Sequence, residues 1–290
     1  MELNNFLLTD FVDRPFLVLI GHPVSHSLSP LMHNTAATYG GVDLTYTAVD
    51  VASGDLSRLP ALLNHPNFRG ANVTIPHKSA VIPMLDQIED TASDLGAVNT
   101  IYRMDGQIGG TNTDVYGFMH PLRQYSNLLD GGEVVVFGSG GASRAVLYAL
   151  GESGVSVIYL VSRSPDDIIP GSYYSRAEIH PISYDAWTYY AEDCSVIVNT
   201  TPLGMHPEID ASPVRNDQIK YLTNKICYDL VYNPAQTVFL QQAERAGATS
   251  VRGLEMLVRQ GSRSWEIWTG KPFPVEEVQS VVEKYLYGQS

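Results

Sequence analysis

The sequence predicts an α/β protein of two domains, each built on a mostly parallel sheet. Short apolar, β-branched runs alternate with amphipathic helical stretches, which is the pattern of parallel α/β architecture. The alternation starts afresh at EVVVFGSGGASRAVLYALGESG, residues 133–154. A chain of 290 residues, 44% hydrophobic and 17% charged, is long enough to form two cores of this kind.

In the first half, three apolar runs are expected to be strands and two later runs to pair as a hairpin around the turn MDGQ. The strand ranges are 16–22, 43–51 and 70–75, and the hairpin ranges are 97–103 and 108–113. Ser29 is expected to cap a helix whose first turn contains Pro30. Asp114 stands where the hairpin is followed by another helix.

The second half repeats the strand and helix pattern and then adds two helices. Strands are expected to begin at 133, 155, 194 and 225, a helix to cover 234–247, and TSVRG to form a last short strand. No element is predicted from 165 to 190. Because no strand follows the two final helices, we expect them to return to the first domain. The predicted domains are 1–114 with 253–290, and a Rossmann-type domain over 115–252, with a cleft between them.

A glycine-rich turn opens the second domain. Gly138, Gly140 and Gly141, with Ser143, follow a predicted strand and lead into a helix. Glycines let the backbone approach a pyrophosphate, and a helix N-terminus offers free N–H groups to it. The alternative is a tight strand-to-helix turn that binds nothing. The context favours a dinucleotide site.

The end of the next strand indicates which dinucleotide would bind. NAD sites usually have an acidic residue there, whereas this chain has Arg163 between two serines, and an arginine fits a 2′-phosphate. NADP is therefore the expected cofactor. Asp166 and Asp167 follow and favour NAD, so NAD is kept as a second cofactor. A solvated loop charge is the alternative interpretation of Arg163.

A solitary lysine in the first domain is the main catalytic candidate. GANVTIPHK ends in Lys78, and no other lysine precedes Lys220. Lys78, Asn99 and Asp114 come from three consecutive strand ends, where open α/β sheets bind ligands. A lysine and an aspartate that converge on one hydroxyl form a proton-transfer pair. The alternative is a surface lysine beside an aspartate that caps a helix.

Ser27 and Ser29 are candidates for binding an anion. Their two hydroxyls, one residue apart in a loop at a strand end, can hydrogen-bond a carboxylate or hydroxyl groups. Helix capping is the alternative, and it is favoured for Ser29. One role does not exclude the other.

Composition excludes several classes of function. A net charge of −13 with no basic run argues against nucleic-acid binding, and no apolar window is long enough for a membrane span. His22, His26 and His33 lack acidic or thiol partners at ligand spacing, so no metal site is expected, and His26 is expected to be a structural hydrogen-bonder. Cys194 and Cys227 are expected to be core thiols, which is typical of a cytoplasmic protein.

Eight sequence strings jointly resemble the shikimate dehydrogenase family, in family order and with similar spacing. The strings are GHPVSHSLSPLMHN, GANVTIPHK, GAVNTI, GGTNTDVYGF, VFGSGGASRA, VNTTPLGM, YDLVYNPAQT and GLEMLVRQGSRSWEIWTG. The resemblance implies a two-domain oxidoreductase that reduces 3-dehydroshikimate to shikimate with NADPH, on the chorismate route to the aromatic amino acids. It implies no nucleic-acid or membrane partner, and a monomer or homodimer.

The resemblance also implies roles for individual residues. The catalytic pair would be Lys78 and Asp114. The substrate contacts would be Ser27, Ser29, Thr74, Asn99, Tyr232 and Gln260. The cofactor contacts would be Gly138, Gly140, Gly141, Ala142, Ser143, Ser162, Arg163, Ser164, Thr200, Leu230, Gly253 and Met256.

Three other functions are compatible with parts of this pattern. A quinate/shikimate dehydrogenase that uses NAD is the nearest, although the retained Ser27 favours shikimate. A relative that binds shikimate without turning it over would need to have lost part of the site, yet Lys78 and Asp114 are both present. A methyltransferase would use a similar glycine turn but would need an acid where Arg163 stands.

Overall fold

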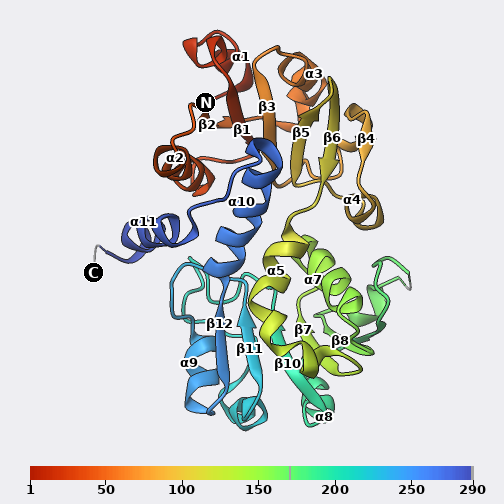
Figure 1. Cartoon of the computed structure of the whole chain (residues 1–290). Helices are drawn as coiled ribbons and strands as arrows, with labels where there is room; N and C mark the ends of the chain where they lie inside the picture. The colour runs from red at the N-terminus through yellow and green to blue at the C-terminus, as the bar shows by residue number, and fades with distance from the viewer. Residues whose placement is uncertain (170, 289–290) are drawn as a thin grey trace. The chain divides into compact units, whose positions relative to one another are not determined.

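The chain divides into two units, each formed around its own sheet (Figure 1). In this computed structural model, residues 1–169 and 171–288 are described, without the side chain of Asn4. The first unit is Met1–Asp114 with Gln260–Tyr285, and the second is Val115–Arg259 with Leu286–Ser290. The predicted fold class, α/β with mostly parallel sheets and a Rossmann-type part, is confirmed.

The first unit contains six strands, four α-helices of its own and parts of the last two helices of the chain. The strands are β1 Phe16–Gly21, β2 Thr45–Asp50, β3 Phe68–Val73, β4 Gln87–Ile88, β5 Thr100–Met104 and β6 Gln107–Thr111. The helices are α1 Leu3–Phe6, α2 Ser29–Gly40, α3 Leu59–Leu63 and α4 Asp90–Leu95. The unit also receives most of α11 Val275–Tyr287 and the later part of α10 Gly253–Thr269.

The strand order of this sheet, β2-β1-β3-β5-β6-β4, can be followed across the upper part of Figure 1. Only β5 runs opposite to its two neighbours, because β5 and β6 form the predicted hairpin. In the register, Thr100 of β5 lies opposite Asn72 of β3 and Thr111 of β6. The amino end of β5 therefore shares one edge of the sheet with the carboxyl ends of β3 and β6.

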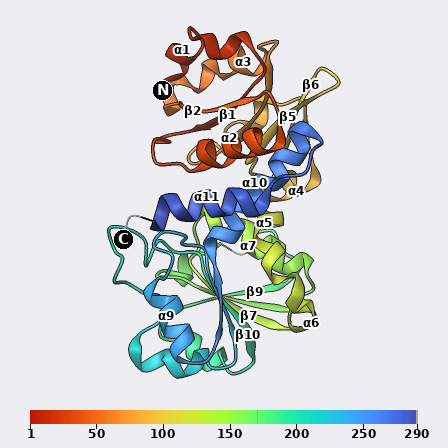
Figure 2. The same ribbon diagram turned by 60° about the vertical axis from the view of Figure 1, so that its left-hand side comes forward.

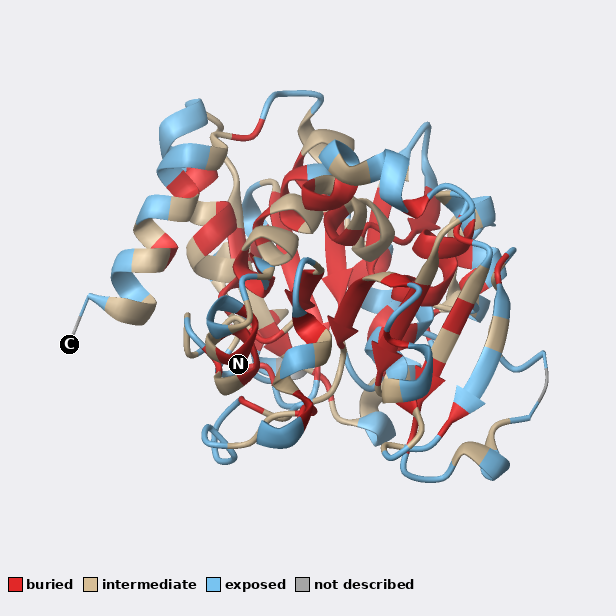
Figure 3. Cartoon of the chain, turned by 90° about the horizontal axis from the view of Figure 1, so that it is seen from below, coloured by how far each residue is buried: buried red, intermediate tan, exposed pale blue. Residues whose placement is uncertain are grey.

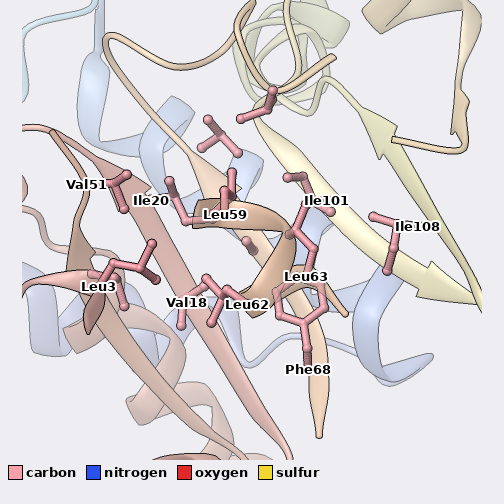
Figure 4. Close-up of a cluster of buried hydrophobic side chains, with 14 of the residues drawn as sticks. Leu3, Val18, Ile20, Val51, Leu59, Leu62, Leu63, Phe68, Ile101 and Ile108 are labelled. Carbon is pink, nitrogen blue, oxygen red and sulfur yellow. The ribbon is translucent and has the colours of Figure 1, made fainter. Parts of the chain in front are cut away.

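An apolar core packs on one face of this sheet. It brings Val18 and Ile20 of β1 together with Leu59 and Leu62 of α3, and Phe68 joins them from β3 (Figure 4). These side chains are fully buried. Burying a side chain of this size contributes about 1.5–3 kcal/mol, so the core fixes the strands whose ends carry the polar residues.

The second unit contains a fully parallel sheet. The strands are β7 Glu133–Phe137, β8 Val157–Val161, β9 Glu178–Ile182, β10 Cys194–Asn199, β11 Ile226–Asp229 and β12 Thr249–Arg252. The helices are α5 Asp114–Leu122, α6 Ser126–Leu129, α7 Gly141–Glu152, α8 Trp187–Tyr190 and α9 Val238–Arg245, with the start of α10. The strand order β12-β11-β10-β7-β8-β9 is that of the dinucleotide-binding doubly wound fold.

Helices cover both faces of this second sheet. Figure 2 shows α7 and α9 on opposite sides of β7 and β10. One core joins Val134 and Val136 of β7 to Val146 of α7, and the other joins Val135 of β7 to Phe239 of α9. A strand buried on both faces needs a continuous apolar run, which the sequence supplies as VVVF. In Figure 3 most of the strands are accordingly buried, and the exposed residues lie on helices, on loops and on an edge strand.

The structure adds elements that the sequence did not indicate. Strand β9 is a polar edge strand that contains Pro181, so it lacks the apolar pattern of its neighbours.

Cys194 and Cys227 are buried free thiols, as predicted, and burial raises the pKa of each to about 12. Within the described residues, no helix combines the length and the apolar character that crossing a bilayer requires.

Candidate active site

Lys78 and Asp114 form an ion pair in the first unit. Lys78 Nζ donates to Asp114 Oδ2 at 2.6 Å, and the two side chains are 31% and 18% exposed. The pair is thus partly withdrawn from water but still open to a ligand. A short, partly buried amine–carboxylate pair can pass a proton to a third oxygen placed against it.

The segment around Lys78 is held by two contacts with residues next to other strands, Val51 after β2 and Val98 before β5. The buried ring of His77 contacts the carbonyl of Val51 through Nε2 at 2.5 Å. The carbonyl of Lys78 accepts from the N–H of Val98 at 2.8 Å. The second contact ties the lysine directly to the segment that leads into Asn99. The loop after β3 is therefore fixed at both sides of the lysine.

Asn99 connects the pair to the interior of the unit. Its Nδ2 donates to Asp114 Oδ1 at 2.8 Å, and its Oδ1 accepts from the N–H of Thr113 at 2.7 Å. A backbone N–H can only donate, so the second bond requires the amide oxygen to face Thr113. The amide nitrogen must then face Asp114.

Behind Asn99 lies a group of buried polar side chains that we call the polar cluster. Each member is at most 5% exposed, and each contacts at least two others. The members are Asn72, Asn99, Thr100, Thr113 and Ser264. Only Asn99 of this set was predicted from the sequence to belong to the site. The available signal was weak: Asn72 is a polar residue inside an apolar strand run, and Ser264 lies on the buried face of α10.

Ser27 and Ser29 lie at the start of α2. The helix begins at Ser29, its N-cap is Leu28, and no side chain caps it from that position. The Oγ of Ser27 instead accepts from the N–H of Ser29 at 3.2 Å, and the two hydroxyl oxygens are 3.3 Å apart. The prediction that Ser29 caps the helix is wrong, because Ser27 reaches the first free N–H. The Ser29 hydroxyl is therefore not used as a cap.

The other predicted substrate contacts fall in different units. Thr74 is half-buried just after β3, and its methyl group lies so close to Gly21 that a Cβ there would be 2.3 Å from it. Gln260 is half-buried on α10 in the first unit. Tyr232 belongs to the second unit, where its carbonyl accepts from the hydroxyl of Tyr287 and burial raises the pKa of its phenol.

A cavity of about 750 Å³ lies at the glycine-rich turn of the second unit. Gly138 lines it and has a φ of +101°, and a Cβ there would lie 2.7 Å from the hydroxyl of Thr200. The backbone at this turn thus approaches β10 more closely than a side chain would allow. Helix α7 starts at Gly141, so its N-terminal N–H groups lie at the same turn. The volume and these N–H groups fit a dinucleotide.

Six of the predicted cofactor contacts line this cavity. They are Gly138, Gly140, Ser162, Arg163, Ser164 and Thr200. Sequence reasoning did not select Tyr173, Tyr184 or Glu208, which line it from the loops around β9 and after β10. No motif marks those three residues. Asp167 also lines the cavity, so an arginine and two carboxylates border the same space.

The remaining predicted cofactor contacts do not line the cavity. They are Gly141, Ala142, Ser143, Leu230, Gly253 and Met256. Ser143 is fully buried, and its hydroxyl donates to the carbonyl of Gly140 at 2.6 Å, so it shapes the turn from inside. Gly253 lies against Leu230, whose carbonyl oxygen would be 2.3 Å from an added Cβ.

Asp229 holds the loop that ends in Tyr232. Its buried carboxylate accepts from the N–H of Val231 at 3.0 Å, from Asn199 Nδ2 at 2.9 Å and from Thr237 Oγ1 at 2.5 Å. Burial raises the pKa of Asp229 to about 6, although these three bonds each lower it. The carboxylate thus anchors the loop that follows β11.

His26 and His33 differ in their exposure and in their contacts. His26 is exposed and makes no hydrogen bond with the described residues, so the prediction of a structural hydrogen-bonder is wrong. His33 is 1% exposed and stacks on Tyr46 at 4.5 Å between the ring centroids. Across residues 1–169 and 171–288, no group of three or more His, Cys, Asp or Glu side chains is arranged to hold a metal ion.

Comparison with known proteins places the chain in a family. A model of the shikimate dehydrogenase substrate binding domain matches residues 19–101, and one of the shikimate 5′-dehydrogenase C-terminal domain matches residues 253–283. A shikimate dehydrogenase (NADP(+)) from Moorella thermoacetica is 39% identical over 280 residues, which cover 94% of each chain.

Two solved structures share the fold over nearly the full chain. Shikimate 5-dehydrogenase from Listeria monocytogenes, in complex with shikimate and NAD, has a TM-score of 0.84 and 28% identity over 93% of this chain and 96% of that one. Quinate dehydrogenase from Corynebacterium glutamicum, in complex with NAD, has a TM-score of 0.82 and 29% identity over 93% and 98%. The predicted resemblance is confirmed, and the chain belongs to the shikimate dehydrogenase family.

Proposed function

We propose that this protein is an NADP-dependent shikimate dehydrogenase, which reversibly reduces 3-dehydroshikimate to shikimate on the route to the aromatic amino acids. The observation that carries the proposal is the pair of Lys78 and Asp114, 2.6 Å apart in a chain of this family. A relative that only binds its ligand would not need a proton-transfer pair.

The first unit supplies the groups that act on the substrate. In the reducing direction, the ammonium of Lys78 gives its proton to the oxygen at C3 of the ring and stabilises the charge that develops there. Asp114 accepts a hydrogen bond from the neighbouring ring hydroxyl and holds the lysine in place. Ser27 and Ser29 bind the carboxylate and so fix which face of the ring is presented. Thr74, Asn99 and Gln260 complete the contacts to the hydroxyl groups.

The second unit supplies the cofactor groups. The glycine turn and the N-terminus of α7 would hold the pyrophosphate, and Arg163 would bind the 2′-phosphate. When bound, the nicotinamide supplies the hydride that C3 of the ring receives. Gly253 and Met256 are assigned to the nicotinamide end of the site, and Tyr232, from the same unit, to the substrate. The domain assignment, 1–114 with 253–290 for substrate and 115–252 for cofactor, belongs to the same proposal.

The cofactor preference follows from the charges around the cavity. Arg163 attracts a 2′-phosphate, whereas Asp167 and Glu208, which border the same cavity, repel it. Because Arg163 would pair directly with the 2′-phosphate, we expect NADP to be used, and because the two carboxylates weaken that preference, we also expect measurable turnover of NAD.

A four-way comparison of initial rates tests the proposal. Shikimate and quinate are each oxidised with NADP and with NAD, and formation of the reduced nicotinamide is followed. The expected result is the highest kcat/KM for shikimate with NADP. Higher efficiency with quinate and NAD would replace the proposal by a quinate dehydrogenase. Tight shikimate binding without turnover in any of the four assays would indicate a relative that only binds.

A further inference from the structure

We propose that Ser264 is a positioning residue that orients the amide of Asn99 toward Asp114, a role that rests on the proposed function. Ser264 lies on α10 and is fully buried. It touches neither Lys78 nor Asp114. Its hydroxyl nevertheless contacts Thr100 and Thr113, the two threonines that contact the side chain of Asn99.

The hydroxyl of Ser264 is surrounded by four polar atoms. Its Oγ lies 3.0 Å from Asn72 Nδ2, 2.8 Å from Thr100 Oγ1 and 3.1 Å from Thr113 Oγ1. The carbonyl of Gln260, one helical turn earlier, lies at 3.1 Å. A serine hydroxyl can donate one hydrogen bond and accept two, so its capacity is fully used in this position.

The donors and acceptors give the cluster a direction. Asn72 Nδ2 can only donate and the carbonyl of Gln260 can only accept, so Ser264 accepts from Asn72 and shares its single proton between that carbonyl and a threonine hydroxyl. Thr100 donates in turn to Asn99 Oδ1 at 2.9 Å, and Thr113 Oγ1 lies 3.2 Å from the same oxygen. The hydrogen bonds from the Thr100 hydroxyl and from the Thr113 N–H both end on the amide oxygen of Asn99 and oppose a flip of that amide.

The orientation of the Asn99 amide determines which group contacts each carboxylate oxygen of Asp114. With its oxygen held inside the cluster, Asn99 presents Nδ2 to Asp114 Oδ1 at 2.8 Å, and the second carboxylate oxygen is left for Lys78. A flipped amide would set its oxygen against a carboxylate oxygen, which is repulsive. Without the Ser264 hydroxyl, the threonines lose a buried partner and this orientation is less strongly enforced.

The test replaces the hydroxyl while keeping the volume. Ser264→Cys fills the same space but hydrogen-bonds weakly, and Ser264→Ala removes the group. Ser262, a second buried serine on α10, gives the matched controls Ser262→Cys and Ser262→Ala. We expect the Ser264 variants to lose on the order of tenfold in kcat while KM for shikimate changes much less, because the pair is misplaced and the substrate carboxylate site is not.

A double-mutant cycle separates positioning from general stability. If Ser264 acts through Asn99, then Ser264→Cys should cause no further loss of kcat in an Asn99→Ala background. Equal losses of kcat in both backgrounds, or a kcat equal to that of the Ser262 controls, would overturn the proposal.

An NMR measurement tests the positioning role of Ser264 without an activity assay. The side-chain amide resonances of Asn99 should shift and exchange faster with solvent in Ser264→Cys than in Ser262→Cys. Unchanged Asn99 resonances would refute the positioning role even if the enzyme is active. Absence of shikimate turnover in the unsubstituted protein would instead refute only the proposed function, since the amide test is independent of it.

Discussion

The candidate sites of the two units differ in whether side chains or backbone atoms form them. In the first unit the candidate site consists of side chains: Lys78, Asp114 and Asn99 bond to one another and are supported by the buried polar cluster. In the second unit, by contrast, the backbone of a glycine turn forms part of the cavity wall, and Gly138 in that turn has a positive φ. The first site should therefore fail when a single functional group is removed, and the second when a single group is added.

The largest effect is expected from removing the amine in the first unit. Lys78→Met keeps the length of the side chain but has no proton to give, so kcat for shikimate should fall by about 10³-fold while shikimate binding is largely retained. Turnover and calorimetric affinity are measured together. Lys271→Met, at an exposed lysine of the same unit, is the control. A kcat within roughly threefold of the unsubstituted enzyme would remove Lys78 from the mechanism.

The converse experiment adds a single methyl group in the second unit. Gly138→Ala places a Cβ 2.7 Å from the Thr200 hydroxyl and requires a φ of +101°, so the turn must shift. We expect KM for the dinucleotide to rise roughly tenfold or more. The free energy of unfolding should fall by about 1–3 kcal/mol. KM for shikimate should change little.

A second glycine separates the contact from the backbone strain. Gly131 also has a positive φ, of +69°, but a Cβ there would have open space around it, and it does not line the cavity. Gly131→Ala should therefore lose stability without changing KM for the dinucleotide. An equal rise in KM for both alanine variants would mean that the close approach to Thr200 does not matter for the cofactor.

A charge reversal at the cavity tests the assignment of the 2′-phosphate. Asp167→Lys replaces a repelling carboxylate by an attracting amine, so the ratio of kcat/KM for NADP over NAD should increase on the order of tenfold. Asp166→Lys is the control because Asp166 is exposed and does not line the cavity. If both variants change the ratio equally, the effect is one of net charge and the phosphate binds elsewhere.

The same contrast explains how far the sequence could predict the molecule. The fold was predictable because alternating apolar runs and helical stretches are local patterns, and the glycine turn is a contiguous motif. Strand β9 was missed because an edge strand with Pro181 has no apolar face to display. The cap of α2 was assigned to Ser29, whereas Ser27 takes that N–H, a choice that depends on loop geometry.

The polar cluster could not be predicted for a different reason. Asn72 and Ser264 are 192 residues apart in the chain and meet only because α10 contacts the sheet of the first unit. Each member taken alone is an ordinary polar residue. Lys78 and Asp114 could be proposed as a catalytic pair from the sequence because a lone lysine is unusual in it. The supporting residues required the contacts themselves.

The smallest expected effect is on stability at mildly acidic pH, where the units should respond in opposite directions. Burial lowers the pKa of His33 in the first unit to about 3. As the pH falls, this histidine is therefore protonated in the unfolded chain before it is protonated in the folded protein. That contribution to stability is complete above pH 6.5 and is lost as the pH falls toward 3. Burial raises the pKa of Asp229 in the second unit to about 6, so its contribution is complete below pH 3.8 and is lost as the pH rises toward 6.

His33→Phe isolates the first of these effects. Phenylalanine fits among aromatic neighbours and has no ring nitrogens, whereas both nitrogens of His33 are buried without a partner in the described part of the chain. Between pH 6.5 and 5, the free energy of unfolding of this variant should gain about 1–2 kcal/mol over that of the unsubstituted protein.

Urea unfolding followed by tryptophan fluorescence measures this difference. In a Trp187→Phe background the signal comes from Trp265 and Trp268 of the first unit, so the second unit contributes nothing to it. His26→Phe, at an exposed histidine of the same unit, should show the pH dependence of the unsubstituted protein. If His33→Phe also follows that dependence, the acid sensitivity of the first unit comes from other groups, and the opposition between the units must rest on Asp229 alone.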